Sequence, residues 1–459
     1  MTAILATLRT EIEHRRRLLG VLLLISSIFL IWGPGLASAQ EGESVATRLR
    51  FENVDGDRIP IEGGRVTVET PDGEVIGEGF SDAEGNLEIP VPGPGNYVLT
   101  LDVETLPEGV VLRDPERVST ETQVLEGQVG RTIFPLIAGD VTIDTDDGVS
   151  LRQVLQLSVE GLKLGLFLGM GAIGLSLIFG TTGLVNFSHS EMIVWGMLVA
   201  YFFNFYGFAG FLGFMAGWPA PFGAGINLAF AALFAIAGGA GMGYAMDKWI
   251  FLPLRERGVS LISQMVVTIG LSLILRYVFL FIFGGSPRFF ADYTAQSAIT
   301  IGIVDITPKD LITAGLSVLI LVGVGVLLLR TKLGKAMRAV ADNRDLAESS
   351  GIDVQRVIRS VWVLGGSLAG LGGVFIGLSE QVSWNIGFRM LLLIFAAVVL
   401  GGLGTAFGAL VGALVVGVGI QVSTLFIPTE LKNVGALALL ILVLVFRPQG
   451  ILGRAERIG

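Results

Sequence analysis

Long apolar runs dominate the chain from residue 151 onwards. Several of them reach the roughly 20 residues that a membrane-spanning helix requires. The sequence predicts about nine spans, give or take one, at approximately 151–179, 192–206, 227–252, 261–283, 311–329, 357–378, 390–403, 407–426 and 434–446. We therefore expect residues 147–459 to form an all-α polytopic membrane bundle of about eight or nine transmembrane helices. The short runs near 180–206 and 390–403 are the candidates for re-entrant segments.

Residues 41–146 show a different pattern, in which apolar and polar positions alternate. The alternation is clearest at Val66 and Val68, through Leu87–Val91 and through Tyr97–Val103, and turn-forming clusters rich in Asp, Gly and Pro separate these stretches. A period of two is typical of half-buried β-strands. The stretch "DAEGNLEIPVPGPGNYVLTL" resembles small transthyretin-like or carboxypeptidase-regulatory-like modules. We expect a small β-sandwich domain here.

The first 39 residues have the organisation of a targeting segment. A basic cluster at 14–17 precedes an apolar stretch at 18–32, and Ala37-Ser38-Ala39 follows with the small-x-small form that signal peptidase accepts. We expect a signal peptide over 1–39, and an uncleaved anchor helix is the alternative. Either one places the β domain outside the cytoplasm.

The two parts of the chain differ in the charge that they carry. Of 40 acidic residues, about 24 fall between Glu41 and Ser150, together with only about 7 of the 31 basic ones. In the remainder, basic residues gather in three segments, at 248–257, 330–359 and 447–457. Lys and Arg concentrate in cytoplasmic loops, so these segments are expected to face the cytoplasm.

The amino-acid composition excludes some kinds of chemical site. The chain is 52% hydrophobic, has 64 glycines and has no cysteine, which excludes thiol nucleophiles and zinc–thiolate sites. The acidic residues of the β domain lack a liganding spacing, so we predict neither a metal site nor a catalytic site there. Glycine and alanine recur every four residues at Gly365, Ala369, Gly373 and Gly377, a pattern that favours close helix packing.

The stretch "GTTGLVNFSHSEM" breaks the apolar pattern with a concentration of polar groups. Such groups at membrane depth are costly, so they usually face a bundle interior or a hydrated cavity. We predict that Asn186, Ser188, His189 and Glu191 line a translocation pathway. Two alternatives are open: these side chains satisfy helix ends structurally, or they lie at the cytoplasmic interface.

Two further sets of polar residues lie nearer the outer ends of the predicted spans. Glu380, Gln381 and Asn385 are candidates for gating or for contact with an external partner. Arg276 is expected to extend to the outer membrane interface.

The loop "RTKLGKAMRAVADNRDLAESSGIDVQRV" predicts two short helices. In the first, Leu333, Ala336, Met337 and Val340 share one face. Asp342 or Asn343 can cap the second, over 344–350, and Gly351 can end it. An exposed, doubly capped short helix is typical of a docking element, and a simple connection between two spans is the alternative.

Within this loop, Asp345-Leu346-Ala347 followed by Gly351 resembles a degenerate EAA-x-x-x-G motif, through which permeases of bacterial ABC importers engage their ATPases. The phrases "GLVNFSHSEM", "RTKLGKAMRAVADN", "AAVVLGGLGTAFGALVGALVVG" and "FRPQGILGR" are similar to the LivH-like permeases of branched-chain amino acid ABC transporters, in the same order and across residues 152–455. In this chain Ser188 and Ser190 replace the family's Ala and Gly. The urea-transporting branch shares most of these motifs.

The resemblance implies a multi-pass permease subunit of the bacterial inner membrane that pairs with a second permease subunit. It also implies cytoplasmic ATP-binding subunits and an external substrate-binding protein as partners. ATPase coupling is then assigned to the segment 336–351, with Ala336, Asp345, Ala347 and Gly351 at the matching positions. The chain has no G-x-x-x-x-G-K-[ST] loop, so it lacks a nucleotide site of its own and is not expected to be an enzyme. No cofactor and no nucleic-acid partner is expected.

Two other classes of function are alternatives to an importer subunit. An ion-coupled secondary transporter would use Glu191 as its coupling site, and a surface receptor would use the β domain as its functional part.

Overall fold

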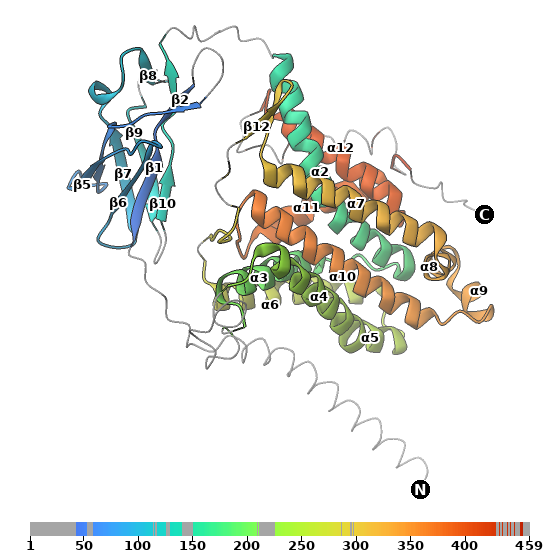
Figure 1. The fold of residues 1–459 in the computed structure, drawn as a ribbon. Coiled ribbons are helices and arrows are strands. Elements are labelled where there is room, and N and C mark those ends of the chain that lie inside the picture. Colours follow the sequence, from blue (N-terminus) through green and yellow to red (C-terminus); the bar gives the residue numbers. More distant parts are fainter. Residues whose placement is uncertain are drawn as a thin grey trace. The chain divides into compact units, whose positions relative to one another are not determined.

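The computed structural model describes the chain in two compact units, one within Pro34–Gly148 and the other within Val149–Gly459 (Figure 1). The described residues are 43–52, 58–112, 114, 117–124, 129–139, 150–208, 210, 225–285, 287–293, 296, 298–427, 431, 434, 438, 441, 445 and 450–452. The expected signal peptide lies outside these residues and stays a prediction.

The first unit is built from strands. They are β1 (Ser44–Arg48), β2 (Arg50–Glu52), β3 (Arg58–Pro60), β4 (Arg65–Glu69), β5 (Val75–Phe80), β6 (Asn86–Pro90), β7 (Gly95–Leu101), β8 (Val110–Leu112), β9 (Ser119–Val124), β10 (Val129–Thr132) and β11 (Leu136–Ala138), with a single 3-10 turn at Val103–Thr105. The alternation at Val66 and Val68 and along Tyr97–Leu101 therefore does mark strands, β4 and β7.

The strands form three small sheets in the orders β10-β1-β6, β3-β2-β11-β8 and β5-β4-β7-β9. In the third sheet β4 pairs antiparallel with β7, and Val66 lies opposite Leu101. The inward positions of these strands, including Val66, Val68, Leu99 and Leu101, are buried in one common apolar core. The unit thus closes its own core, and its likeness to transthyretin-like modules stays a prediction.

The second unit is helical. Its elements are α2 (Leu151–Thr182), α3 (His189–Tyr206), α4 (Leu228–Ala245), the π-helical segment η3 (Met246–Phe251), α5 (Leu252–Glu256), α6 (Leu261–Phe283), the hairpin β12 (Ile299–Ile301) and β13 (Val304–Ile306), α7 (Pro308–Arg330), α8 (Lys332–Asp342), α9 (Arg344–Ser349), α10 (Val354–Ser379), α11 (Ile386–Gly401) and α12 (Ala406–Ser423).

The number of spans differs from the expectation of about nine. Within the described residues six helical stretches are long and apolar enough to cross a membrane: α2, the stretch from α4 through α5, α6, α7, α10 and α12. Two of the predicted spans are not among these six. The α3 helix carries the polar residues His189, Glu191 and Asn204, and α11 has only 16 residues. The expected last span, 434–446, lies almost wholly outside the described residues.

Glycine allows the central helices to approach closely, as the four-residue repeat predicted. On α10, a Cβ on Gly365 would lie 3.3 Å from the backbone of Gly174 in α2. A Cβ on Gly373 would collide with the carbonyl of Ile193 in α3, and Ala369 between them is fully buried. Backbone-to-backbone packing of this kind is typical of membrane helices, where dispersion contacts replace the hydrophobic effect as the driving force.

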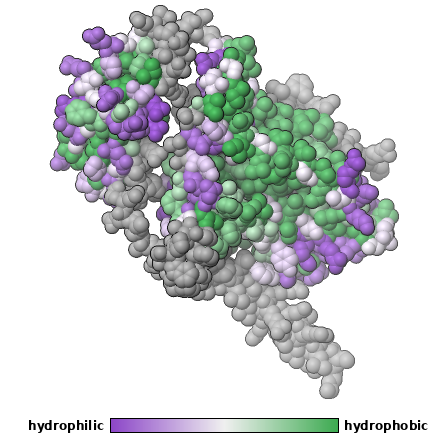
Figure 2. Space-filling view, in the orientation of Figure 1, coloured by the Kyte–Doolittle hydropathy of each residue, from purple (hydrophilic) through white to green (hydrophobic). Residues whose placement is uncertain are grey.

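The helices α6 and α7 lie at the periphery of this unit. Only 28% of the apolar window of each helix is buried, and large side chains such as Ile262, Phe281 and Leu319 are more than 60% exposed. The visible face of the helical unit is correspondingly apolar (Figure 2). A surface of this kind is suited to the hydrocarbon core of a bilayer.

Candidate functional site

The polar stretch singled out in the sequence joins α2 to α3. The α2 helix ends at Thr182, because Gly183 adopts the left-handed conformation with a φ of +70°. The chain then runs without helical structure to Ser188, and α3 begins at His189. The backbone N–H of Phe187 donates to Thr268 Oγ1 at 3.2 Å, seven residues into α6. At 1.5 Å per residue, the polar stretch therefore lies about 10 Å inside the end of α6.

Asn186 and Ser188 satisfy the turn that precedes α3. Asn186 Oδ1 accepts hydrogen bonds from the backbone N–H of Ser188 at 3.1 Å and from its hydroxyl at 2.6 Å. This is an Asx turn, in which a side-chain carbonyl takes the place of a backbone acceptor. Both side chains are fully buried.

His189 reaches across to α2. Its Nε2 lies 3.0 Å from the carbonyl oxygen of Gly171 and donates to it, which fixes the tautomer. Gly171 is eleven residues before the end of α2, or about 16 Å along the axis. His189 is fully buried, and a Cβ on Gly174 would lie 3.1 Å from its Cε1 atom. A glycine at 174 therefore makes room for the ring.

Glu191 forms a buried ion pair with Arg276. One carboxylate oxygen of Glu191 lies 3.0 Å from Arg276 Nη2 and accepts from the hydroxyl of Ser272 at the same distance. Arg276 also stacks on the Phe388 ring, 4.5 Å from its centroid. The expectation that Arg276 extends to the outer interface is thus wrong: its side chain is 12% exposed and turns inward to the fully buried Glu191.

These four predicted pathway residues thus lie in one region of the bundle, where α2, α3 and α6 come together. None of the four has any exposed surface in this chain. Each has at least one partner inside the bundle, as the alternative of satisfied helix ends would require. Asn186 Nδ2, His189 Nδ1 and one carboxylate oxygen of Glu191 nevertheless have no hydrogen-bond partner within the described residues. Lining of a pathway stays a prediction, and it requires a state in which these helices separate.

The loop after α7 folds as the capping signals predicted. Asn343 caps α9, with its Oδ1 accepting from the backbone N–H of Leu346 at 2.9 Å. Gly351 follows the helix with a φ of +83°. Ala347 is buried, whereas Leu346 is 64% exposed. The α9 helix is therefore anchored on one side and presents an apolar side chain to its surroundings on the other.

The preceding helix, α8, fixes α9 to the bundle. Met337 and Val340 are buried in the main apolar core, Ala336 is partly buried against it and Lys335 is exposed. Asp345 lies exposed in the first turn of α9, where a carboxylate interacts favourably with the helix dipole. Both short helices contact α10.

A second buried charge lies near the start of α10, and sequence reasoning missed it. Asp247, in η3, lies 2.5 Å from Arg255 Nη2 and 3.5 Å from Arg359 Nε. Arg255 in turn donates to Gln355 in the first turn of α10. A carboxylate inside an apolar run and just before a basic segment is the signal that could have found it. The cluster links the end of α4 to the helix that follows α9.

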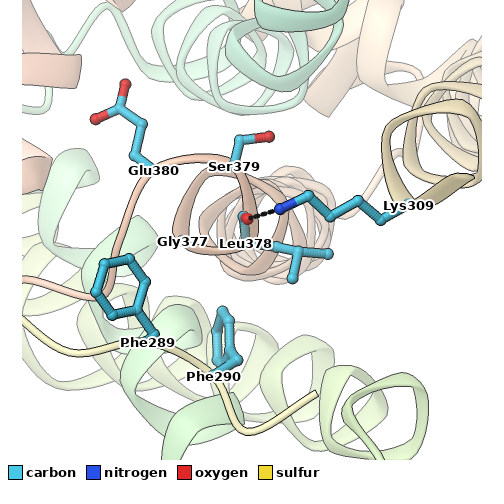
Figure 3. Close-up of a pocket in the computed structure, with 7 residues that line it drawn as sticks. All are labelled: Phe289, Phe290, Lys309, Gly377, Leu378, Ser379 and Glu380. Carbon is cyan, nitrogen blue, oxygen red and sulfur yellow. Dashed lines mark hydrogen bonds between the residues drawn. The ribbon is translucent and has the colours of Figure 1, made fainter. Parts of the chain in front are cut away.

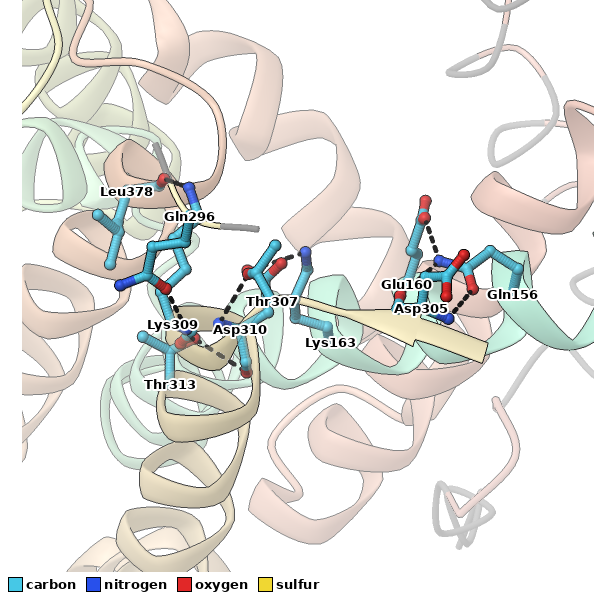
Figure 4. A network of polar contacts seen from close by, with 10 residues as sticks. All are labelled: Gln156, Glu160, Lys163, Gln296, Asp305, Thr307, Lys309, Asp310, Thr313 and Leu378. Atoms are coloured by element: carbon cyan, nitrogen blue, oxygen red, sulfur yellow. Dashed lines mark hydrogen bonds and ion pairs between the residues drawn. The ribbon is translucent and has the colours of Figure 1, made fainter. Parts of the chain in front are cut away.

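A third polar network lies at the other ends of α7 and α10 (Figure 4). Lys163 on α2 pairs with Asp310 on α7 at 3.1 Å. The side-chain amide of Gln156 exchanges two hydrogen bonds of 2.9 Å with the backbone of Asp305, which holds β13 against α2. These contacts fix the hairpin and the first turn of α7 to the longest helix of the unit.

Known proteins with similar sequences show the family to which this chain belongs. A family model described as "Branched-chain amino acid transport system / permease component" matches residues 157–444. The high-affinity branched-chain amino acid transport system permease protein LivH of Escherichia coli (strain K12) is 30% identical over an alignment of 322 residues that covers 66% of this chain and 96% of LivH. BraD of Pseudomonas aeruginosa, with the corresponding description, is 29% identical over 67% of this chain and 98% of its own length.

Among solved structures, PsaBC from Streptococcus pneumoniae in complex with Fab aligns with 65% of this chain and 92% of its own, at 14% identity and a TM-score of 0.36. That score is too low to carry an argument, and the sequence matches decide the family. Its members are membrane components of ABC importers that work with ATP-binding subunits and a substrate-binding protein, and they are not themselves enzymes. The chain belongs to the family of branched-chain amino acid transport system permease components and is a multi-pass inner-membrane permease subunit of an ABC importer.

Proposed function

We propose that this chain, paired with a second permease subunit, forms the pathway through which an ATP-driven importer moves branched-chain or other small amino acids into the cell. The substrate class follows that of the similar proteins LivH and BraD, which are described as branched-chain amino acid permeases. The observation that carries the mechanism is α9, a short helix that is capped at both ends and anchored through Ala347, with Leu346 left exposed.

In this proposal α9 is the coupling helix, and the ATP-binding subunit docks on it. Leu346 inserts into that subunit, while Asp345 stabilises the first turn of the helix. Ala347 and Ala336 hold the loop against the bundle, and the left-handed Gly351 turns the chain directly into α10. A displacement of α9 is then transmitted to α10 and, through Arg359 and Asp247, to α4. Closure of the ATP-binding subunits would thereby rearrange the central helices.

The polar groups at the start of α3 act on the substrate in the rearranged state. In the state described here Asn186, Ser188, His189 and Glu191 are enclosed and internally bonded. Separation of α3 from α6 would expose the Glu191–Arg276 pair to the pathway, and separation of α3 from α2 would expose the imidazole of His189. The pair would then offer charges of both signs to a zwitterionic amino acid.

The orientation in the membrane follows from the same assignment. If α9 faces the cytoplasm, the opposite ends of α7 and α10 face outwards. The β unit of residues 41–146 then lies outside the cytoplasm, as a small transthyretin-like module behind a signal peptide or anchor at 1–39. The substrate-binding protein delivers its ligand to that outer face.

The test is transport by the reconstituted importer. Proteoliposomes containing the full complex and its binding protein are expected to accumulate labelled L-leucine when ATP is present on the side of the ATP-binding subunits. An ion gradient without ATP should not drive uptake. Accumulation of urea in preference to leucine would reject the amino acid assignment and favour the urea-transporting branch.

A pair of variants tests the coupling role of α9. Leu346→Asp is expected to abolish co-purification with the ATP-binding subunit, because a charge would replace the exposed apolar side chain. Ile301→Asp is the matched control, since Ile301 is 54% exposed but lies on β12, at the other end of α7. Retained association in Leu346→Asp, or equal loss in both variants, would contradict the assignment.

A further inference from the structure

A cavity of about 220 Å³ lies where α7 begins and α10 ends (Figure 3). Seven residues line it: Phe289, Phe290, Lys309, Gly377, Leu378, Ser379 and Glu380. Because α8 and α9 join the far ends of α7 and α10, the cavity is at the opposite end of these two helices from α9. If α9 contacts the ATP-binding subunit, the cavity opens on the outer face, where the substrate arrives.

Two helix ends of opposite polarity meet at this cavity. Lys309 is the second residue of α7, whose N-terminal end carries a partial positive charge. Leu378 and Ser379 are the last two residues of α10, whose C-terminal carbonyls carry a partial negative charge, and Glu380 follows them. One wall of the cavity therefore favours an anion and the other favours a cation.

The charged side chains of the cavity have bonding capacity left for a ligand. Lys309 Nζ donates to the neutral carbonyl of Leu378 at 3.2 Å, and it forms no ion pair within the described part of the chain. The carboxylate of Glu380 is one-third exposed and lies 3.9 Å from Arg389, a separation at the limit of an ion pair. An ammonium group has three donors, so Lys309 can bind a carboxylate and keep its present bond.

Two aromatic rings supply an apolar surface beside these charges. Phe290 is buried and Phe289 is 52% exposed. Gly377 leaves room next to the Phe290 ring, which a Cβ at that position would approach to 3.1 Å. The segment that carries the rings is fixed to the other wall, because Arg288 and Val382 exchange backbone hydrogen bonds of 2.9 and 2.7 Å. The cavity is thus built from preorganised walls.

We propose that this cavity is the entry site for the substrate and binds a zwitterionic amino acid with an apolar side chain. The α-carboxylate pairs with Lys309, the α-ammonium group bonds the terminal carbonyls of α10 and Glu380, and the side chain packs on Phe289 and Phe290. Drug-sized ligands occupy pockets of about 300–1,000 Å³, so the smaller volume here suits a single amino acid. This inference rests on the proposed import of amino acids and adds the site that first receives them.

The test uses the full importer complex in lipid nanodiscs, without the substrate-binding protein. Binding is measured by saturation-transfer-difference NMR with three probes: L-leucine, isocaproate, which lacks the ammonium group, and isoamylamine, which lacks the carboxylate. Lys309→Met is expected to weaken binding of leucine and isocaproate by roughly 10- to 100-fold, the value of a charge-assisted hydrogen bond, and to leave isoamylamine unaffected. Glu380→Gln is expected to weaken the binding of leucine and isoamylamine and to leave the binding of isocaproate unchanged.

Two further variants supply a control outside the cavity and a test of its apolar wall. Arg152→Gln removes an exposed positive charge beside Asp305, outside the cavity, and should bind all three probes as the unmodified complex does. Phe289→Ala removes a half-exposed ring from the cavity wall. It should weaken the binding of L-leucine more than the binding of L-alanine, which is added as a fourth ligand. Co-purification with the ATP-binding subunits confirms that each variant has folded.

The outcome separates this inference from the proposed function. If the importer accumulates leucine but Lys309→Met binds all three probes with unchanged affinity, the entry site is wrong and the proposed function stands. If the unmodified complex accumulates no amino acid in proteoliposomes, the proposed function fails and this inference fails with it.

Discussion

At the scale of single residues, the helical unit buries charge in pairs rather than singly. Glu191 and Asp247 are both fully buried, and each lies within ion-pair distance of an arginine on a different helical element. The desolvation penalty of such a pair is large, so it adds little net stability, but removal of one partner leaves an uncompensated charge. These residues therefore fix which helices lie together.

The first prediction concerns Arg276. Arg276→Met is expected to destabilise the folded helical unit by about 3–5 kcal/mol, because the Glu191 carboxylate would lose its counter-charge. The double variant Glu191→Gln/Arg276→Met should recover most of this loss. The measurement is the free energy of unfolding in mixed detergent micelles. Arg389→Gln, at a 46% exposed side chain, is the control and should cost less than about 1 kcal/mol.

The second prediction compares two glycines. A Cβ on Gly174 would lie 2.9 Å from the backbone of Gly365 and 3.1 Å from His189, whereas a Cβ on Gly241 in α4 would meet nothing within 4 Å. Gly174→Ala should therefore destabilise the unit by about 1–3 kcal/mol through overpacking. Gly241→Ala should stabilise it by about 0.5–1 kcal/mol, because alanine is the better helix former. Equal unfolding midpoints for both variants would contradict the packing described here.

At the scale of elements, local signals predicted α9 well and predicted the spans less well. Asn343 and Gly351 are adjacent in sequence to the helix that they bound, so capping chemistry is readable from the sequence alone. The inward turn of Arg276 depends on Glu191, 85 residues earlier in the chain, and no local pattern records that pairing. The same holds for Asp247 with Arg359. The polar stretch at 186–191 stands out in the sequence, but its enclosure depends on three helices.

The third prediction concerns the N-cap of α9. Asn343→Ala removes the side-chain acceptor for the Leu346 N–H and should weaken the short helix by about 0.5–2 kcal/mol. A less ordered α9 transmits less force, so more ATP should be hydrolysed for each substrate molecule transported. Asn343→Asp retains the cap and should restore the normal ratio. An unchanged ratio in Asn343→Ala would show that order in α9 does not matter for coupling.

At the scale of the whole molecule, the chain combines two units that each close a core of their own. Alternating apolar positions build one core, and in the other unit the four-residue repeats of small residues bring together the helices whose large apolar side chains form the core. Both periodicities were readable from the sequence. The count of spans was not, because hydropathy alone does not separate a complete crossing from a shorter helix such as α11, which ends at Gly401.

The fourth prediction follows from this separation. Removal of residues 43–139, with the targeting segment kept, should leave ATP-driven uptake by the reconstituted complex unchanged, because among the residues that the structure describes each unit builds its apolar core from its own side chains. Uptake is measured beside the full-length complex at equal amounts of assembled ATP-binding subunit. A loss of uptake in a correctly assembled complex would assign the β unit a direct part in transport.

The length of α2 sets a condition on the membrane around this protein. Its 32 residues extend about 48 Å, whereas the hydrocarbon layer of a bilayer is about 30 Å thick. The surplus of roughly 18 Å must project beyond the lipid tails or be absorbed by inclination of the helix. Because Gly161 and Gly165 on α2 pack against the backbone of α12, the two helices must incline together. Lipids with longer or shorter acyl chains would then change the angle of a packed helix pair, and through it the rate of turnover.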